Sequence, residues 1–214
     1  MGSRGGQDYI TIRNARDQEI SDALLPLDTP LWSPDHTRFT VLFDPGRVKR
    51  GILPNRRMGR PLTPGETFTM SVQAGWPDAH GVPMAATFQR EYRVGPPIER
   101  GLEPREWTIS PASAGSRQPL TVEFPWPLDH ALLQRTLSVT RGDTAVAGDV
   151  TVAAGERRWL FTPRDPWQPG DYALVAQPAL EDVAGNRVGH AFETGAADAD
   201  DARAAAARVI FTIR

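Results

Sequence analysis

Prolines are spread along the whole chain and interrupt nearly every apolar run. The 214 residues include 20 prolines and 19 glycines. Each proline removes a backbone hydrogen-bond donor and fixes φ, so this spacing is incompatible with long helices. The chain must therefore fold from short segments joined by turns, and its length suffices for two domains of about 100 residues each.

Apolar and polar residues alternate with a period of two in many short segments, which is the pattern of a strand with one buried face. In "PLTVEF", for example, Leu120, Val122 and Phe124 share one face. The same alternation occurs in "YITIRN", "RFTVLF", "TFTMSV", "TFQREYRV", "TLSVT", "RRWLFTP", "DYALVAQ" and "RVIFTIR". This spacing predicts an all-β protein of the antiparallel sandwich type.

The pattern occurs twice along the chain. The segment that begins at Pro61, "PLTPGETFTMSV", recurs 105 residues later as "PWQPGDYALV". Further on, "WPDAHGVPM" and "LEDVAGNRV" match at an offset of 104, with Asp78 and Gly81 recurring as Asp182 and Gly185. One gap reconciles the two offsets, and "HTRFTVLFDP" likewise parallels "GERRWLFTPRDP". A repeat of this length predicts two copies of one module.

The joint between the copies lies in "VGPPIERGLEPREW", where prolines and charges alternate. Such a segment favours a stiff connector over a packed element. We therefore predict a module at residues 1–97, a Pro-rich connector at 98–104 and a module at 105–214. The second module carries an Ala/Asp-rich insertion near 194–207, which has so little to bury that we expect a mobile loop.

The second copy resembles the bacterial immunoglobulin-like domain of the S-layer (SbsA) type. The resemblance rests on "PLTVEFPWPLDHALLQRTLSV", "GDVTVAAGERRWLFTPRDPWQPGDYALV", "LEDVAGNRV" and the closing "VIFTIR". It extends over residues 104–214 and, more weakly, over the first copy. It implies a tandem of immunoglobulin-like antiparallel β-sandwiches in a bacterial protein outside the cytoplasm, in the periplasm or at the cell surface.

The first copy departs from this pattern at its beginning. The second copy opens with "WTISP" and "PLTVEFPWPL", and only eight residues precede Tyr9 in the first. We therefore expect the first module to lack its first strands and Met1 to be an internal methionine, either of a longer gene or of a piece cut from one. An export signal is then expected upstream. A sandwich without these strands has an open edge and an uncovered apolar face. We expect it to be less stable than the second module or to associate with another chain.

Charge and composition exclude several classes of protein. A net charge of −2 and a pI near 6.1 provide no field that would attract nucleic acid. The absence of cysteine excludes disulfides and thiolate zinc sites. No apolar run approaches the roughly 20 residues of a membrane span, and "MGSRGGQDYITIRN" is not a signal peptide.

No arrangement of residues in the sequence indicates catalysis. Nucleophile-elbow, phosphate-loop and dinucleotide-binding motifs are absent, and the acidic residues are dispersed. The four histidines lack metal-ligand spacing. We therefore expect a protein that is not an enzyme, without catalytic residues, cofactor or metal.

The most basic loop is "DPGRVKRGILPNRRMGRP", which has no acid between Asp44 and Glu66. Loops of this length are functional or mobile. One interpretation is a surface that binds an acidic polysaccharide, a lipid headgroup or a partner protein. The alternative is a solvent-exposed loop that only connects two strands. The candidate residues are Arg47, Lys49, Arg50, Arg56, Arg57 and Arg60.

The stretch "LEDVAGNRVG" also allows two interpretations. As a tight turn, it uses an acid that bonds its own backbone and a glycine that adopts positive φ. As a weak Ca²⁺ candidate, it offers Asp182 and Asn186. Calcium takes six to eight oxygens, far more than these residues supply. The acid and the glycine recur in the first copy while Asn186 does not, which favours the turn.

Six tryptophans allow either a sugar-stacking platform or a packed core, and packing is favoured because aromatics dominate small cores. They are Trp32, Trp76, Trp107, Trp126, Trp159 and Trp167.

Together the resemblance and the absence of catalytic motifs predict a non-catalytic structural, spacer or adhesion module of a bacterial cell-envelope protein. Its expected partners are other domains of a longer polypeptide or a cell-surface polymer. The alternative is a ligand-binding module for a glycan, Ca²⁺ or a protein partner.

Overall fold

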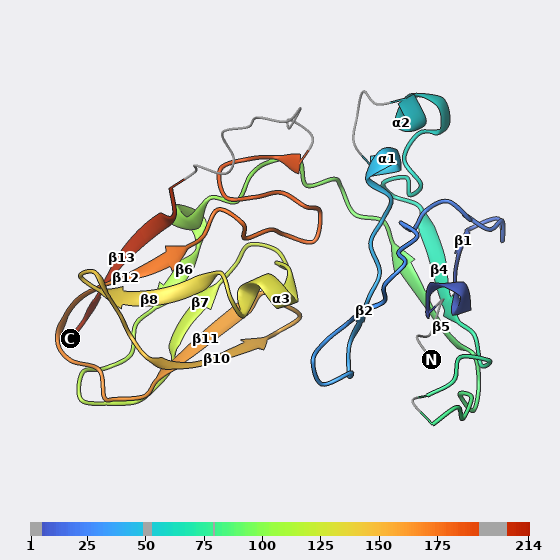
Figure 1. Ribbon diagram of the computed structural model, residues 1–214. Helices are drawn as coiled ribbons and strands as arrows, with labels where there is room; N and C mark the ends of the chain where they lie inside the picture. Colours follow the sequence, from blue (N-terminus) through green and yellow to red (C-terminus); the bar gives the residue numbers. More distant parts are fainter. Residues whose placement is uncertain (1–5, 49–52, 79, 193–204) are drawn as a thin grey trace. The chain divides into compact units, whose positions relative to one another are not determined.

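In the computed structural model of the protein, most of the regular secondary structure is strand and forms four antiparallel sheets, which confirms the all-β prediction (Figure 1). The chain divides into two compact units, Met1–Pro97 and Ile98–Arg214. The structure describes residues 6–48, 53–78, 80–192 and 205–214. Most of the predicted insertion, and with it the expectation of a mobile loop, lies outside the described residues.

The first unit contains one three-stranded sheet in the order β1-β4-β5 and one two-stranded sheet, β2-β3. Its helices are short, as the prolines predict. The elements are the 3₁₀ helix η1 (Gly6–Tyr9), β1 (Ile10–Asn14), β2 (Leu31–Trp32), β3 (Phe39–Thr40), α1 (Pro45–Val48), α2 (Leu53–Met58), β4 (Thr67–Val72) and β5 (Phe88–Arg93).

The three-stranded sheet of the first unit has one apolar face. Side chains alternate across a strand, so Phe68, Met70 and Val72 of β4 lie on the same face. On that face Phe68 stacks against its cross-strand partner Tyr92, with ring centroids 5.2 Å apart. This face is poorly covered, since Phe88, the partner of Val72, remains 54% exposed.

The second unit contains two four-stranded sheets, with the strand orders β10-β11-β7-β6 and β13-β12-β8-β9. Every predicted strand of this half forms a strand of the structure. The elements are η2 (Pro104–Glu106), β6 (Thr108–Ser110), β7 (Leu120–Glu123), α3 (His130–Leu133), β8 (Leu137–Arg141), β9 (Thr144–Ala145), β10 (Gly148–Ala153), β11 (Arg158–Pro163), β12 (Gly170–Ala176) and β13 (Ala207–Ile213).

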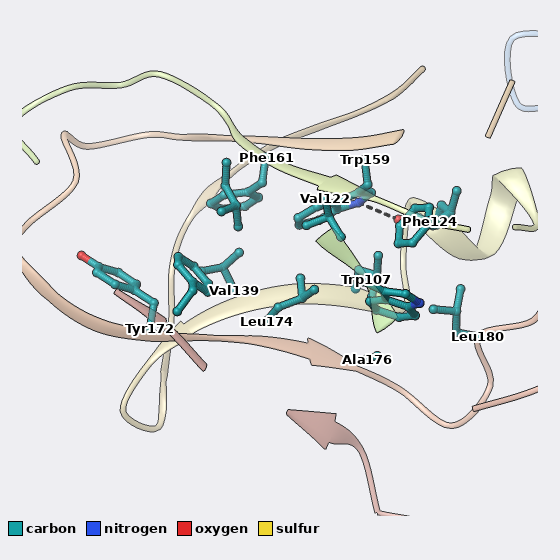
Figure 2. Close-up of a cluster of buried hydrophobic side chains, with 14 of the residues drawn as sticks. Trp107, Val122, Phe124, Val139, Trp159, Phe161, Tyr172, Leu174, Ala176 and Leu180 are labelled. Atoms are coloured by element: carbon teal, nitrogen blue, oxygen red, sulfur yellow. Dashed lines mark hydrogen bonds between the residues drawn. The ribbon is translucent and has the colours of Figure 1, made fainter. Parts of the chain in front are cut away.

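The core of the second unit lies between its two sheets, as Figure 2 shows. Val122 of β7 and Trp159 of β11 face Val139 and Leu174 of the other sheet, and all four side chains are buried. Trp159 also donates its indole N–H to the carbonyl oxygen of Leu133 at 3.0 Å. Fully burying a large apolar side chain contributes about 1.5–3 kcal/mol, so this cluster is the main stabilising feature of the unit.

Residues 98–104, which the sequence suggested as a connector, form part of the second unit. Leu102 is buried and exchanges two backbone hydrogen bonds with the loop after β12. Its N–H donates to the carbonyl of Arg187 at 2.8 Å, and it accepts from the N–H of Gly189 at 2.9 Å. The contact is close, since a Cβ on Gly101 would lie 2.3 Å from the backbone nitrogen of His190. The sequence did not indicate the pairing of Leu102, because its partners Arg187 and Gly189 lie far along the chain.

Candidate functional site

The carboxylate of Asp182 is the centre of a buried polar cluster in the second unit. Only 3% of the residue is exposed. Its Oδ1 accepts hydrogen bonds from the backbone N–H groups of Ala184 at 2.8 Å and Asn186 at 2.9 Å. Its Oδ2 accepts from the indole Nε1 of Trp126 at 2.9 Å and from Nδ2 of Asn186 at 2.8 Å. Four donors thus surround the carboxylate.

The side chain of Asn186 extends this cluster to two further segments. Its Nδ2 also donates to the carbonyl oxygen of Ile98 at 3.0 Å. Its Oδ1 accepts from the backbone N–H of Phe192 at 2.9 Å. Asn186 is fully buried, so its amide holds the first residue of the second unit against the loop that follows β12.

The same turn occurs around Asp78 in the first unit, but it is exposed to solvent there. Oδ1 of Asp78 accepts from the backbone N–H of His80 at 2.8 Å and of Val82 at 2.9 Å. These N–H groups, Val82 first and then His80, lower the pKa of the carboxyl. Gly81 has a φ of 82°, and Gly185 has 83°. The prediction of an Asp-Gly turn is therefore confirmed in both units.

A calcium ion at Asp182 would have to displace hydrogen-bond donors that already occupy both carboxylate oxygens. Calcium takes six to eight oxygen ligands at 2.3–2.6 Å. Among the described residues, no three His, Asp or Glu side chains form a group that could hold a metal. The geometry around Asp182 and Asn186 is that of a structural turn.

The basic loop does not present Arg47 to solvent, contrary to the interpretation of the loop as an anion-facing patch. Arg47 is only 6% exposed, and its guanidinium pairs with Asp22. Its Nε also donates to the carbonyl oxygen of Gly59 at 2.9 Å, which closes the loop around α1 and α2. No pattern in the basic loop indicated this contact, because Asp22 lies outside the loop.

The other candidate residues of the loop are more dispersed. Arg56 and Arg57 are exposed on α2, and Arg60 is half-buried. Lys49 and Arg50 lie outside the described residues. Arg56 and Arg57 are therefore the only two of the six that the described part of the loop leaves exposed.

The tryptophans of the second unit serve mainly in packing. Trp107, Trp159 and Trp167 are buried in the core. Trp126 is half-buried, with the guanidinium of Arg100 placed 4.6 Å from its ring centroid. For these residues the structure agrees with the prediction of packing.

Trp32 of the first unit is different, since it is 39% exposed. It belongs to an aromatic cluster in which its ring centroid lies 4.9 Å from Phe39 and 5.9 Å from Trp76. Tyr9 stacks on Trp76 at 6.0 Å. The sequence did not show that Trp32 joins this cluster, because its aromatic partners come from other segments of the chain.

A scan of the chain against protein-family models gave no match, and neither did a search of curated protein sequences. No helix in the described part of the chain has the length and apolar character needed to cross a membrane. What the fold and site define is a mostly β protein of two units with a buried Asp-Asn cluster. Its function has to be inferred from that geometry.

Proposed function

We propose that the chain is a tandem of immunoglobulin-like modules and serves as a non-catalytic structural, spacer or adhesion part of a bacterial cell-envelope protein. The strand order of the second unit supports the fold. An immunoglobulin sandwich has the orders A-B-E-D and C-F-G. With β6 as strand A, the sheets of the second unit have the orders D-E-B-A and G-F-C, with β9 added beside C.

A hydrogen bond at the start of β12 also supports this assignment. The phenolic Oη of Tyr172 donates to the backbone carbonyl of Gln168 at 3.0 Å. In immunoglobulin-like domains, a tyrosine near the start of strand F bonds back to the backbone a few residues upstream. The strand order supports the assignment of β12 to position F independently of this bond.

The equivalence of the two units is supported by three local features. The sheet β1-β4-β5 has the order C-F-G if β4 corresponds to β12. Phe68 and Tyr92 stack across β4 and β5, as Tyr172 and Phe211 stack across β12 and β13 at 5.8 Å. The Asp-Gly turn that follows β4 recurs after β12 with the same hydrogen bonds.

The observation that carries the spacer role is the attachment of Ile98 to the turn by Asn186. Tension that enters the second unit from its N-terminal side reaches Ile98 first. The bond from Asn186 and the two backbone bonds of Leu102 tie this segment to the loop after β12. Hydrogen bonds that resist such tension are suited to a spacer. In a ligand-binding site, the polar atoms of Asn186 would instead be available to the ligand.

Single-molecule pulling of the full chain from its two termini tests the spacer role. We expect two unfolding events, with the second unit unfolding at the higher force because it has the larger core. Asn186→Ala should lower that force. The control is Val183→Ala, since Val183 is 66% exposed in the same turn. An unchanged unfolding force for Asn186→Ala would reject the spacer role.

The exposed ring of Trp32 supports a second candidate, glycan binding by the first unit. Aromatic rings provide the flat apolar surface on which a sugar ring stacks. Titration with bacterial cell-wall oligosaccharides should quench tryptophan fluorescence, and Trp32→Ala should abolish the change. The control is Trp107→Phe, since Trp107 is buried in the other unit. Quenching that survives Trp32→Ala would exclude this site.

A further inference from the structure

The segment 39–43, which consists of β3 and the three residues after it, has one backbone edge without a partner in the described part of the chain; this edge is called the edge of β3 below. On its other side, the carbonyl of Leu42 accepts from the N–H of Leu25 at 2.8 Å, and the N–H of Asp44 donates to Ala23 at 2.9 Å. Backbone groups point to alternate sides along a strand. The N–H and C=O of Val41 therefore point away from this hairpin, and no hydrogen bond to them is found among the described residues.

The equivalent edge in the second unit is occupied. The match of "RFTVLF" with "RRWLFTP" aligns Phe39 with Trp159, and both are paired in an antiparallel hairpin, with Trp32 and with Val152. On its other side β11 pairs with β7, where Trp159 lies opposite Val122. The strand that would correspond to β7 is absent from the described residues of the first unit.

The first unit leaves more large apolar side chains exposed than the second. Of 22 buried hydrophobic residues in the described chain, only Ile12 and Ala23 belong to the first unit. Of eleven exposed large hydrophobic residues, all but Val183 and Ile210 belong to it. Isolated exposed apolar residues are normal, but nine in the first unit show that its apolar side chains are less covered than those of the second.

We propose that the edge of β3 binds an antiparallel β-strand supplied by a partner polypeptide. The bound strand has large apolar residues at alternate positions, as Leu120, Val122 and Phe124 provide in the second unit. Its backbone pairs with Val41, and its apolar face lies beside the exposed side chains of Trp32 and Phe43. Addition of a strand to a sheet edge is a common mode of peptide recognition. The proposal rests on the equivalence of the two units but not on the spacer role.

A peptide with the sequence of residues 117–126, RQPLTVEFPW, is the probe, added to the full chain. Hydrogen exchange is measured at the amides of residues 39–43. At a peptide concentration 100 times its Kd, a bound strand should slow the exchange of the edge amides by about 100-fold. The control peptide carries Leu120→Asn, Val122→Asn and Phe124→Asn and should give no protection. Equal protection by both peptides, or by neither, would overturn the proposal.

Two variants locate the binding edge. Val41→Pro removes an N–H that the free chain does not use, and proline prevents strand addition at an edge. This variant should lose the protection, whereas Val41→Thr keeps the N–H and should retain it. Peptide protection of the Val41→Pro variant at the wild-type level would refute the site. If Val41→Pro does not fold, Val41→Thr and the two peptides still decide the question.

Sedimentation of the free chain distinguishes the partner from a second copy of this chain. A concentration-dependent dimer that protects residues 39–43 and is lost in Val41→Pro would identify a second copy as the occupant and overturn the proposal of a separate partner. A monomer whose edge amides exchange rapidly until the peptide is added would support it. Neither result depends on the pulling experiment, so the two proposals fail separately.

Discussion

Replacing Asp182 with alanine should destabilise the second unit strongly. The change removes the acceptor for four N–H groups and leaves the buried N–H of Asn186 and the indole N–H of Trp126 without their partner. A buried donor without a partner costs about 1–3 kcal/mol. Asn186 Nδ2 keeps its bond to Ile98, so two donors dominate the loss. We expect the free energy of unfolding to fall by about 3–5 kcal/mol, and Tm by on the order of 10 °C.

Asp78→Ala is the matched control, since it removes the same two backbone bonds from an exposed carboxylate. Water can solvate the released N–H groups there, so Tm should fall only slightly. Urea unfolding followed by tryptophan fluorescence gives the free energy of unfolding of each variant, and thermal unfolding gives its Tm. Hydrogen exchange assigns each transition to its unit. Similar losses for the two variants, or a loss below about 1 kcal/mol for Asp182→Ala, would refute the argument that burial of the donors sets the cost.

Three further predictions concern packing, close approach and pH. Trp159→Phe leaves a buried carbonyl of α3 without its donor, and should lower the free energy of unfolding by about 2 kcal/mol in urea unfolding. Gly101→Ala places a methyl group against the backbone of His190, and should cost about 1–3 kcal/mol by the same measurement; a neutral effect would show that the loop yields. The hydroxyl of Ser33, followed by backbone N–H donors, lowers the pKa of Asp35 to about 2 from 3.8. Its stabilising contribution is therefore complete above pH 3.8 and lost as pH falls through about 2, and NMR titration of Ser33→Ala should show a higher midpoint.

The alternating pattern of the sequence was sufficient to predict most strands of the second unit. Val122 lies between Thr121 and Glu123 and is buried in the core, and Trp159 and Leu174 are buried there as predicted. The turn at Asp182 was predicted from another local pattern, an acid and a glycine that the backbone of such a turn requires. Alternation is a short-range property of a strand, so it can be recognised without knowing which strands pair.

The polar contacts of the candidate site could not be predicted, because they join residues that are far apart in the sequence. Arg47 was expected to face solvent, but it is buried and pairs with Asp22. Asp22 belongs to a segment outside the basic loop. Asn186 was considered only as a weak Ca²⁺ ligand, and its amide instead bonds to Ile98, which is 88 residues away. The sequence by itself thus determined an all-β chain with a repeated turn. Only the tertiary structure decided which polar side chains are used internally, because burial and long-range hydrogen bonds arise when distant segments pack together.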